Sequence, residues 1–534
     1  MIARSELGNG SRRDRATVRW DFWILLLVAL GLRLVSLDKS LGRDEIVSIF
    51  SIRLGWGELV PYTLAYNSHP PLLAVLLHLW TTISSSVWWG RFLIVLLGVG
   101  VCGWVYAIGR EYRDRAAGLQ AMLFATVAPA FVWGSQYLRG YMLYTFFSAA
   151  SVYTMLRLLE GRRDRATWAG YAVVTSLSVY SFYYAGCVWI AQNIYVLISR
   201  QRMRSLGSRW WLVQGAVAIS LIPLSFLFAD QFFGKIISND LLVQQRGFYV
   251  GSIYVGGWVR SFQSVFGLDP LFLFETPLSE LLPRSQLVAL AGLIFVGILG
   301  TLFLALRGSR LTRGNGEENQ AGFLIWMVVI PVVIANGVGE VFDVAVAPYY
   351  FLFGFVPLAV LLTDVIRAMP HPLLGRCVIV ALVCLAMVRV LQLYPMEPDN
   401  WKAIAAYVDE VSRPPDCVGT ARVGRQPLLF YRTQTFPLMA FGEYYIPGQS
   451  TAKSNLLRLR KDLEPCRQIW MIYDAYRFDS SKTFYHQWLV DQGYLRGEER
   501  EFKGASVVLY RKNKVGSLLS PDGPTANVRA SDSL

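Results

Sequence analysis

The sequence predicts a polytopic α-helical membrane protein with a small α/β domain near its C-terminal end. Of its 534 residues, 54% are hydrophobic, above the roughly 45–50% usual for soluble domains. Apolar stretches recur from Phe22 to about Tyr394, each near the ~20 residues that a helix needs to cross a bilayer. After Pro395 the composition changes, and helix-like and strand-like segments alternate.

The chain begins with an arginine-rich segment, residues 1–19, followed by an apolar run at 22–37 that lacks a small-residue cleavage site. We therefore expect a retained first helix and not a cleaved signal peptide. The positive-inside rule places the arginine-rich segment in the cytoplasm.

Arginine clusters predict the remaining topology of residues 20–395. If all five clusters between the later apolar segments are cytoplasmic, ten further spans follow, which makes eleven in total. They are expected at 88–109, 116–135, 139–158, 168–182, 185–199, 210–229, 286–306, 321–339, 347–366 and 377–395. Because each span carries the chain to the opposite side of the membrane, residues 38–87, residues 230–285 and everything after Tyr394 are then expected outside the cytoplasm.

One further segment, residues 72–83, is apolar and resembles a span in composition. A crossing there would place the next arginine cluster outside, so we expect a juxtamembrane or re-entrant helix on the outer face. A true span is the alternative.

Residues 396–515 are expected to form the extracytoplasmic α/β domain. Helical spacing at 401–411 follows Asp399 and Asn400, either of which could cap a helix. Further helices are expected near 427–432 and 484–490, and strands at 468–473 and 505–510. Residues 516–534 are rich in Ser, Pro, Gly and Asp, a composition typical of disorder.

Two of the six cysteines, Cys417 and Cys466, fall in this domain. In an oxidising compartment they could form a disulfide, and two buried thiols are the alternative. Their pattern includes no CxxC or His/Cys cluster that would indicate zinc. The net charge of +14 lies mostly in short cytoplasmic loops, where it serves orientation and lipid contact, so nucleic-acid binding is not expected.

The pair Asp44-Glu45 lies seven and eight residues beyond Leu37, at the predicted outer surface. Carboxylates at this boundary can act as a general base on a substrate whose tail stays in lipid. The alternative is a solvated pair that caps a helix at 46–54.

Cationic and phenolic side chains occupy other outer turns. His69 precedes Pro70-Pro71 at a predicted helix start, where a phosphate contact or a simple helix start would fit. Arg139 is the one arginine of its short outer hairpin, and its fork suits a phosphate; snorkelling to headgroups is the alternative. Tyr349-Tyr350 could belong to an aromatic belt.

Arg33 and Arg389 lie near the outer ends of predicted helices, and we expect both to snorkel toward the interface. The outer surface lacks a pool of nucleotide-activated substrates, so a transfer enzyme there is best served by a donor carried in the membrane. A lipid phosphate fits the cations described above.

Four motifs, taken in order, resemble those of bacterial GT-C glycosyltransferases of the protein mannosyltransferase and aminoarabinose transferase-like group. They are Gly42-Arg43-Asp44-Glu45, Asn67-Ser68-His69-Pro70-Pro71-Leu72, Ser135-Gln136-Tyr137-Leu138-Arg139-Gly140-Tyr141 and Asn400-Trp401-Lys402-Ala403-Ile404. The resemblance covers most of the chain. It implies a GT-C fold and an integral inverting enzyme of a bacterial inner membrane that uses a polyprenyl-phosphate sugar.

The resemblance also implies residue roles. Asp44 is the expected base and Glu45 orients the site, while His69 and Arg139 bind the lipid phosphate together with Tyr141 and Tyr350. Where the family often has Arg-Tyr at a late span, this chain has Tyr349-Tyr350. The missing cation could come from the outer loop, which carries Lys235, Arg246 and Arg260.

The implied reaction moves a sugar to a hydroxyl acceptor on a glycolipid, polysaccharide or protein. No metal is expected, although Asp343 or Glu340 could join the acid pair around a divalent cation. The alternatives are a transporter or flippase for a lipid-linked substrate, which predicts similar halves, a lipid-linked polymer ligase, and a sensor with an extracytoplasmic binding domain.

Overall fold

A computed structural model describes residues 10–51, 54–66, 69–231, 318–341, 346, 348–396, 400–420, 425–433, 438–441, 453–474 and 479–513. These residues group into two compact units. The first, here called the membrane unit, falls within Met1–Lys39 and Val47–Met396. The second falls within Ser40–Ile46 and Glu397–Leu534.

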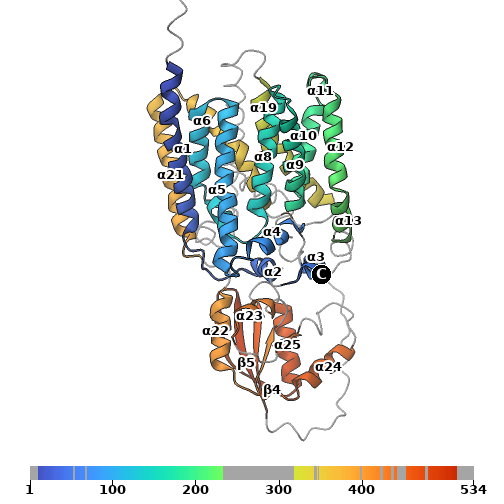
Figure 1. The fold of residues 1–534 in the computed structure, drawn as a ribbon. Helices are drawn as coiled ribbons and strands as arrows, with labels where there is room; N and C mark the ends of the chain where they lie inside the picture. The colour runs from blue at the N-terminus through green and yellow to red at the C-terminus, as the bar shows by residue number, and fades with distance from the viewer. Residues whose placement is uncertain are drawn as a thin grey trace, which may run out of the picture. The chain divides into compact units, whose positions relative to one another are not determined.

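The membrane unit is helical (Figure 1). Its elements, including α2, which starts in the second unit, are α1 (Gly10–Leu34), α2 (Arg43–Ser51), α3 (Trp56–Tyr66), α4 (Leu72–Trp80), α5 (Val87–Tyr112), α6 (Arg115–Val127), α7 (Pro129–Gln136), α8 (Tyr141–Leu159), α9 (Arg165–Ser181), α10 (Ala185–Leu197), α11 (Arg200–Leu206), α12 (Ser208–Ser220), α13 (Ile222–Gln231), α19 (Glu318–Val341), η2 (Pro348–Gly354), α20 (Phe355–Arg367) and α21 (Pro372–Leu393).

The chain is a multi-pass membrane protein. Among the described residues, five helices are long and apolar enough to cross a bilayer, and up to seven if each bent pair counts as one span. The eleven predicted spans stay a prediction, and the one at 286–306 lies outside the described residues. Helix α4 has nine residues, fewer than the ~20 that a crossing needs, which fits the juxtamembrane helix expected there.

The span predicted at 116–135 is not one straight helix. It divides into α6 and α7, which are bent by 59°. Pro129 explains the break, because proline has no N–H to donate and disfavours helical geometry in the residue before it. Ala128 accordingly has a ψ of 118°.

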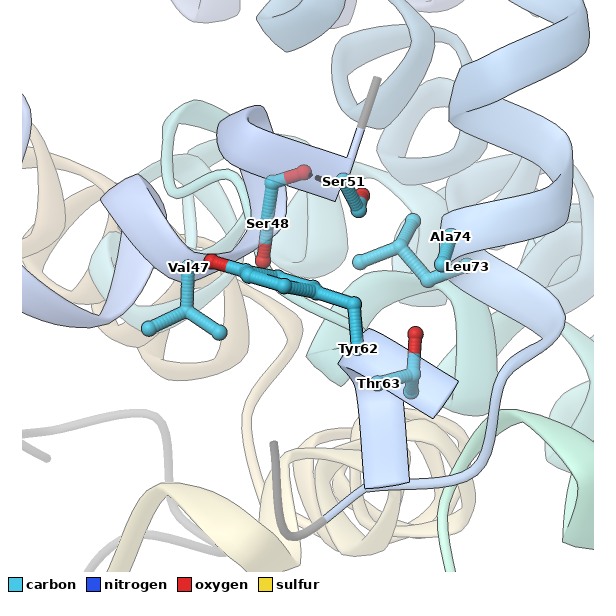
Figure 2. Close-up of a pocket in the computed structure, with 7 residues that line it drawn as sticks. All are labelled: Val47, Ser48, Ser51, Tyr62, Thr63, Leu73 and Ala74. Atoms are coloured by element: carbon cyan, nitrogen blue, oxygen red, sulfur yellow. Dashed lines mark hydrogen bonds between the residues drawn. The ribbon is translucent and has the colours of Figure 1, made fainter. Parts of the chain in front are cut away.

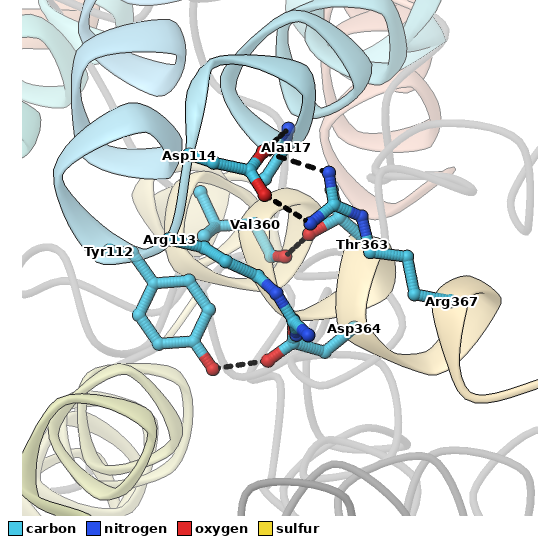
Figure 3. Close-up of polar contacts among 8 residues, drawn as sticks. All are labelled: Tyr112, Arg113, Asp114, Ala117, Val360, Thr363, Asp364 and Arg367. Carbon is cyan, nitrogen blue, oxygen red and sulfur yellow. Dashed lines mark hydrogen bonds and ion pairs between the residues drawn. The ribbon is translucent and has the colours of Figure 1, made fainter. Parts of the chain in front are cut away.

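A cluster of ion pairs holds the turn between α5 and α6 against α20 (Figure 3). Asp364 accepts hydrogen bonds from the Tyr112 hydroxyl and from Arg113. Arg367 donates to both oxygens of Asp114, at 2.7 and 2.9 Å. We call Arg113, Asp114, Asp364 and Arg367 the paired cluster.

The second unit contains a mixed sheet of five strands in the order β2-β1-β3-β5-β4. Strand β1 is parallel to β2 and β3, and β5 is antiparallel to β3 and β4. The elements are α22 (Trp401–Val411), β1 (Cys417–Thr420), α23 (Arg425–Tyr431), β2 (Leu438–Ala440), α24 (Lys453–Leu463), β3 (Gln468–Asp474), α25 (Asp479–Asp491), β4 (Tyr494–Phe502) and β5 (Ala505–Lys512).

Alternation along the strands gives this sheet two apolar faces. Ile469, Met471 and Tyr473 of β3 share a buried cluster with residues of α24 and α25, whereas Trp470 faces the other way and contacts Tyr407 of α22. Successive strand residues point to opposite faces, so helices cover both sides. Asn400 caps α22 by accepting from the Ala403 N–H at 3.2 Å, and Asp399 lies outside the described residues.

Cys417 and Cys466 form a disulfide with a Cα–Cα distance of 5.5 Å. The alternative of two buried thiols is therefore wrong. The five expected segments of the domain correspond to α22, α23, β3, α25 and β5. The sequence did not predict β1, β2, α24 or β4.

Candidate active site

Helix α2 carries the acid pair in its first turn. The Glu45 side chain is fully buried, and its Oε2 accepts a hydrogen bond from the Gly42 backbone N–H at 2.9 Å. A glutamate that reaches back to the residue before the helix is one half of a capping box. The capping role considered for the pair therefore falls to Glu45, and the helix begins at Arg43, earlier than the expected 46.

Asp44 is partly exposed. Its carboxylate makes no hydrogen bond or ion pair with the residues that the structure describes. The two acids thus differ: one stabilises the helix start, and the other leaves its oxygens available to a ligand.

The second unit holds the segment that carries the pair. The Leu41 N–H donates to the Tyr431 hydroxyl at 2.7 Å, and the Lys402 N–H donates to Ser40 Oγ at 3.4 Å. Tyr431 is the last residue of α23, and Lys402 lies in the first turn of α22. The α/β domain therefore fixes the backbone just before Asp44.

His69 lies just before Pro70-Pro71 and α4. Its ring centroid is 5.0 Å from that of Phe182 and 6.1 Å from that of Tyr141. Burial among these rings, and then the positive charge of Arg139, hold the pKa of His69 well below its ordinary value near 6.5. A neutral imidazole can donate one N–H to a ligand while its other nitrogen stays an acceptor.

Arg139 follows α7 in the turn that leads to α8. Only 7% of its surface is exposed, and its Nη1 lies 3.4 Å from Ser48 Oγ in α2. The side chain therefore points into the protein and does not snorkel toward headgroups.

Tyrosines from two distant parts of the chain meet beside His69 and Arg139. The Tyr141 ring centroid is 4.9 Å from Tyr349 and 6.1 Å from Tyr350, and the Tyr350 carbonyl accepts from the Tyr144 hydroxyl at 2.6 Å. The membrane unit thus brings together four predicted site residues, which with Tyr349 we call the cation–aromatic set: His69, Arg139, Tyr141, Tyr349 and Tyr350. Asp44 and Glu45 belong to the second unit.

Two aromatic neighbours of this set were not predicted. Phe182 and Tyr184 have ring centroids 5.0 and 4.9 Å from that of Tyr350. Both lie at the break between α9 and α10. The run Phe182-Tyr183-Tyr184 at a predicted turn was the signal that could have revealed them.

Figure 2 shows a pocket that is lined in part by Ser48, the residue that Arg139 contacts. Its empty volume of about 250 Å³ includes open solvent. Four of its lining residues carry hydroxyl groups: Ser48, Ser51, Tyr62 and Thr63. Thr63 also lines a second, smaller hollow together with His69. Hydroxyls in an otherwise apolar wall can orient a polar ligand.

Within the described residues, no group of three or more His, Cys, Asp or Glu side chains could hold a metal ion. Asp343 and the Glu340 side chain lie outside those residues, as do the loop cations Lys235, Arg246 and Arg260. Metal independence stays a prediction.

A known protein family matches part of the membrane unit. Residues 68–227 match the family of dolichyl-phosphate-mannose-protein mannosyltransferases, a range that contains His69 and Arg139 but not the acid pair. A search with the sequence found no matching curated protein.

Solved structures match over nearly the whole chain. The structure of ArnT from Cupriavidus metallidurans bound to undecaprenyl phosphate is 13% identical, with a TM-score of 0.54 over 94% of this chain and 99% of that one. The same enzyme without ligand is 11% identical, with a TM-score of 0.54 over 91% and 97%. The oligosaccharyltransferase AglB from Archaeoglobus fulgidus, in complex with an inhibitory peptide and a dolichol-phosphate, is 13% identical, with a TM-score of 0.54 over 87% and 70%.

The class that emerges is a GT-C membrane fold with an appended α/β domain. Within it, the matches confirm the predicted resemblance to the protein mannosyltransferase and aminoarabinose transferase-like group.

Proposed function

We propose that this protein is an integral membrane glycosyltransferase that moves a sugar from a polyprenyl-phosphate donor to a hydroxyl acceptor on the outer face of a bacterial inner membrane. The observation that carries the proposal is the cation–aromatic set. It combines a largely buried guanidinium and an imidazole with three phenols. An acidic leaving group beside lipid requires such surroundings.

The donor phosphate binds to this set. Arg139 offers a planar fork that matches phosphate oxygens, and neutral His69 donates an N–H hydrogen bond without adding charge. Tyr141 and Tyr350 contribute hydroxyl groups and apolar ring faces. A phosphate that has lost its sugar gains negative charge, so these groups stabilise the leaving group more than the bound donor.

Asp44 acts as the base in a single displacement. Its carboxylate takes the proton of the acceptor hydroxyl, whose oxygen forms the new bond to the anomeric carbon. The bond between that carbon and the phosphate oxygen breaks, and the electron pair leaves with polyprenyl phosphate. Attack opposite the leaving group inverts the anomeric configuration.

Helix α2 supports this division of labour. Asp44 and Ser48 are four residues apart in α2 and therefore lie on one face of that helix. Ser48 is the residue whose hydroxyl Arg139 contacts.

The outer face is favoured by the disulfide. Cys417–Cys466 belongs to the same unit as the segment Ser40–Ile46, and disulfides persist in oxidising compartments. The proposal therefore puts both the α/β domain and Asp44 in the periplasm or outside the cell, with the N-terminus in the cytoplasm.

The test is donor turnover by purified protein in lipid nanodiscs. Several polyprenyl-phosphate sugars are supplied together with cell-envelope acceptors, and released polyprenyl phosphate is measured by mass spectrometry. Asp44→Asn should abolish release, whereas Glu58→Gln, which changes an exposed acid in the first turn of α3, should not.

Release that is unaffected by Asp44→Asn would overturn the assignment of the base. No release from any donor would overturn the transferase and favour a transporter of a lipid-linked substrate, which transbilayer flux measurements would then detect.

A further inference from the structure

Arg33, near the end of α1, is fully buried and does not snorkel as the sequence predicted. Its guanidinium donates hydrogen bonds from all three nitrogens. The acceptors are Ser135 Oγ at 3.1 Å, the carbonyls of Ala29, Thr126 and Ala125 at 3.0, 3.1 and 3.1 Å, and Cys102 Sγ at 3.5 Å. These contacts use the five N–H groups of the side chain.

The bend between α6 and α7 explains why an arginine is placed here. Ala125 lies four residues before Pro129, so its carbonyl lacks the N–H that a continuous helix would supply. Ala125 and Thr126 lie in the last turn of α6, which is also the negative end of the helix dipole. Arg33 therefore satisfies carbonyls that the proline break leaves open and complements that dipole.

Helix α7 makes a reciprocal contact with α1. Gln136 Nε2 donates to the carbonyls of Arg33 and Val35, at 3.3 and 2.7 Å, where α1 ends. Arg33 of α1 thus binds carbonyls of α6 and the Ser135 hydroxyl of α7, while Gln136 of α7 binds carbonyls at the end of α1. We call Arg33, Ser135 and Gln136 the exit clasp, because it joins the points where the chain leaves α1 and α7.

Gly98 of α5 makes this arrangement possible. A Cβ at this position would come within 1.9 Å of Ser135 Oγ and 3.3 Å of Arg33 Nε. Ser135 is fully buried and accepts a hydrogen bond from Arg33, so moving its side chain would disturb the clasp. The site therefore requires glycine.

A second buried arginine extends the contact along the chain that leaves α1. Arg91 of α5 is 2% exposed, and its Nη1 donates to the carbonyls of Leu37 and Lys39, both at 2.8 Å. The backbone is therefore held from the end of α1 to the residue before the segment Ser40–Ile46.

We infer that the exit clasp is a positioning device for the donor phosphate: it fixes the end of α7 so that Arg139, three residues after Gln136, is held in place. Arg33 touches no substrate, since its N–H groups are already bonded within the protein. The inference rests on the proposed function, because it assumes that Arg139 binds the phosphate.

The experiment is a double-mutant cycle on the full chain in nanodiscs, with undecaprenyl phosphate as the probe and native mass spectrometry as the binding measurement. Arg33→Gln should weaken binding by about tenfold or more, the loss expected when a hydrogen bond to a charged group is weakened. In an Arg139→Gln background the same change should cost nothing further, because coupled residues are not additive.

Gly98→Ala perturbs the clasp without removing a charge and should show the same loss of binding. Its matched control is Gly100→Ala in the same helix, where an added Cβ would come within 2.6 Å of the Phe146 ring and not of the clasp. Gly100→Ala should leave binding within about twofold of the wild type.

Additive effects of Arg33→Gln and Arg139→Gln, or equal losses for the two glycine variants, would overturn the inference while leaving the transferase intact. A wild type that neither binds undecaprenyl phosphate nor releases it from a donor sugar would overturn the proposed function, and the inference with it. If Arg33→Gln does not fold, the comparison of Gly98→Ala with Gly100→Ala tests the inference by itself.

Discussion

The paired cluster and the cation–aromatic set both use arginine, but they balance its charge differently. In the paired cluster, two aspartates face two arginines, so the members sum to zero. The members of the cation–aromatic set include one guanidinium, a neutral imidazole and no carboxylate. In the paired cluster the carboxylates occupy the guanidinium groups, whereas the cation–aromatic set combines a guanidinium fork and an imidazole, groups that suit a phosphate.

The largest expected effect separates two aspartates. Asp44→Asn should lower transfer by about 10²–10⁴-fold, since a general base is lost, and should leave the thermal unfolding temperature unchanged, because the Asp44 carboxylate has no partner among the described residues. Asp364→Asn should lower the thermal unfolding temperature and leave transfer per folded molecule unchanged. That aspartate is 6% exposed and bonded to Tyr112 and Arg113, and breaking a buried pair costs about 3 kcal/mol or more.

Both variants would be compared by donor turnover per folded molecule and by thermal unfolding in nanodiscs. If Asp364→Asn abolished turnover without loss of stability, the distinction between the two clusters would be wrong.

Arginine substitutions sharpen the same contrast at a smaller magnitude. Arg139→Lys should raise the KM for donor by about tenfold, because lysine keeps the charge but loses the bidentate fork. Arg113→Lys, in the paired cluster, should leave the KM for donor unchanged and lower only the unfolding temperature. Steady-state kinetics over a range of donor concentrations would measure both, and equal KM values for Arg139→Lys and the wild type would remove Arg139 from the phosphate site.

The low pKa of His69 predicts how folding stability depends on pH. Because its pKa lies well below 6.5, the folded protein binds no proton there as the pH falls through 6.5, whereas the unfolded chain does. Stability should therefore fall as the pH drops below 6.5, and His69→Gln should reduce that dependence. Donor KM should stay flat between pH 6 and 8 in the wild type, and a steep decrease on acidification would show that His69 binds phosphate as a cation.

The smallest effect concerns Asp114. Its hydrogen bond from Arg367 is the main reason that its pKa falls to about 2, and it also caps α6 by accepting from the Ala117 N–H at 2.8 Å. Asp114→Asn keeps a capping side chain but loses the ion pair, which is largely exposed to solvent, so a loss of at most about 1 kcal/mol is expected.

The contribution of the Asp114 carboxylate is present above pH 4 and is lost as the pH falls toward 2, because the folded pKa is depressed. Calorimetry at several pH values would reveal it. An Asp114→Asn variant with weaker donor binding would contradict the separation of the paired cluster from the site.

Several features were predictable because they depend on local patterns. Periodicity and apolar length gave the helices, including the short α4, and β-branched and aromatic runs gave β3 and β5. Elements with weaker patterns were missed: β1 and β2 have four and three residues, and β4 is mostly polar because most of that edge strand is exposed. Pro129 was visible in the sequence, yet the apolar run around it predicted an unbroken span.

The sequence by itself determined the membrane character, the change to an α/β domain and the residues expected to carry chemistry, because these follow from composition and from the order of short motifs. Only the tertiary structure decided how the motifs divide their work. Within Ser135-Gln136-Tyr137-Leu138-Arg139-Gly140-Tyr141, the first two residues bind Arg33, and Arg139 reaches toward Ser48. Similarly, Glu45 caps α2 while Asp44 does not. Such assignments depend on partners up to about a hundred residues away, and no local pattern encodes which distant carbonyl a buried side chain will meet.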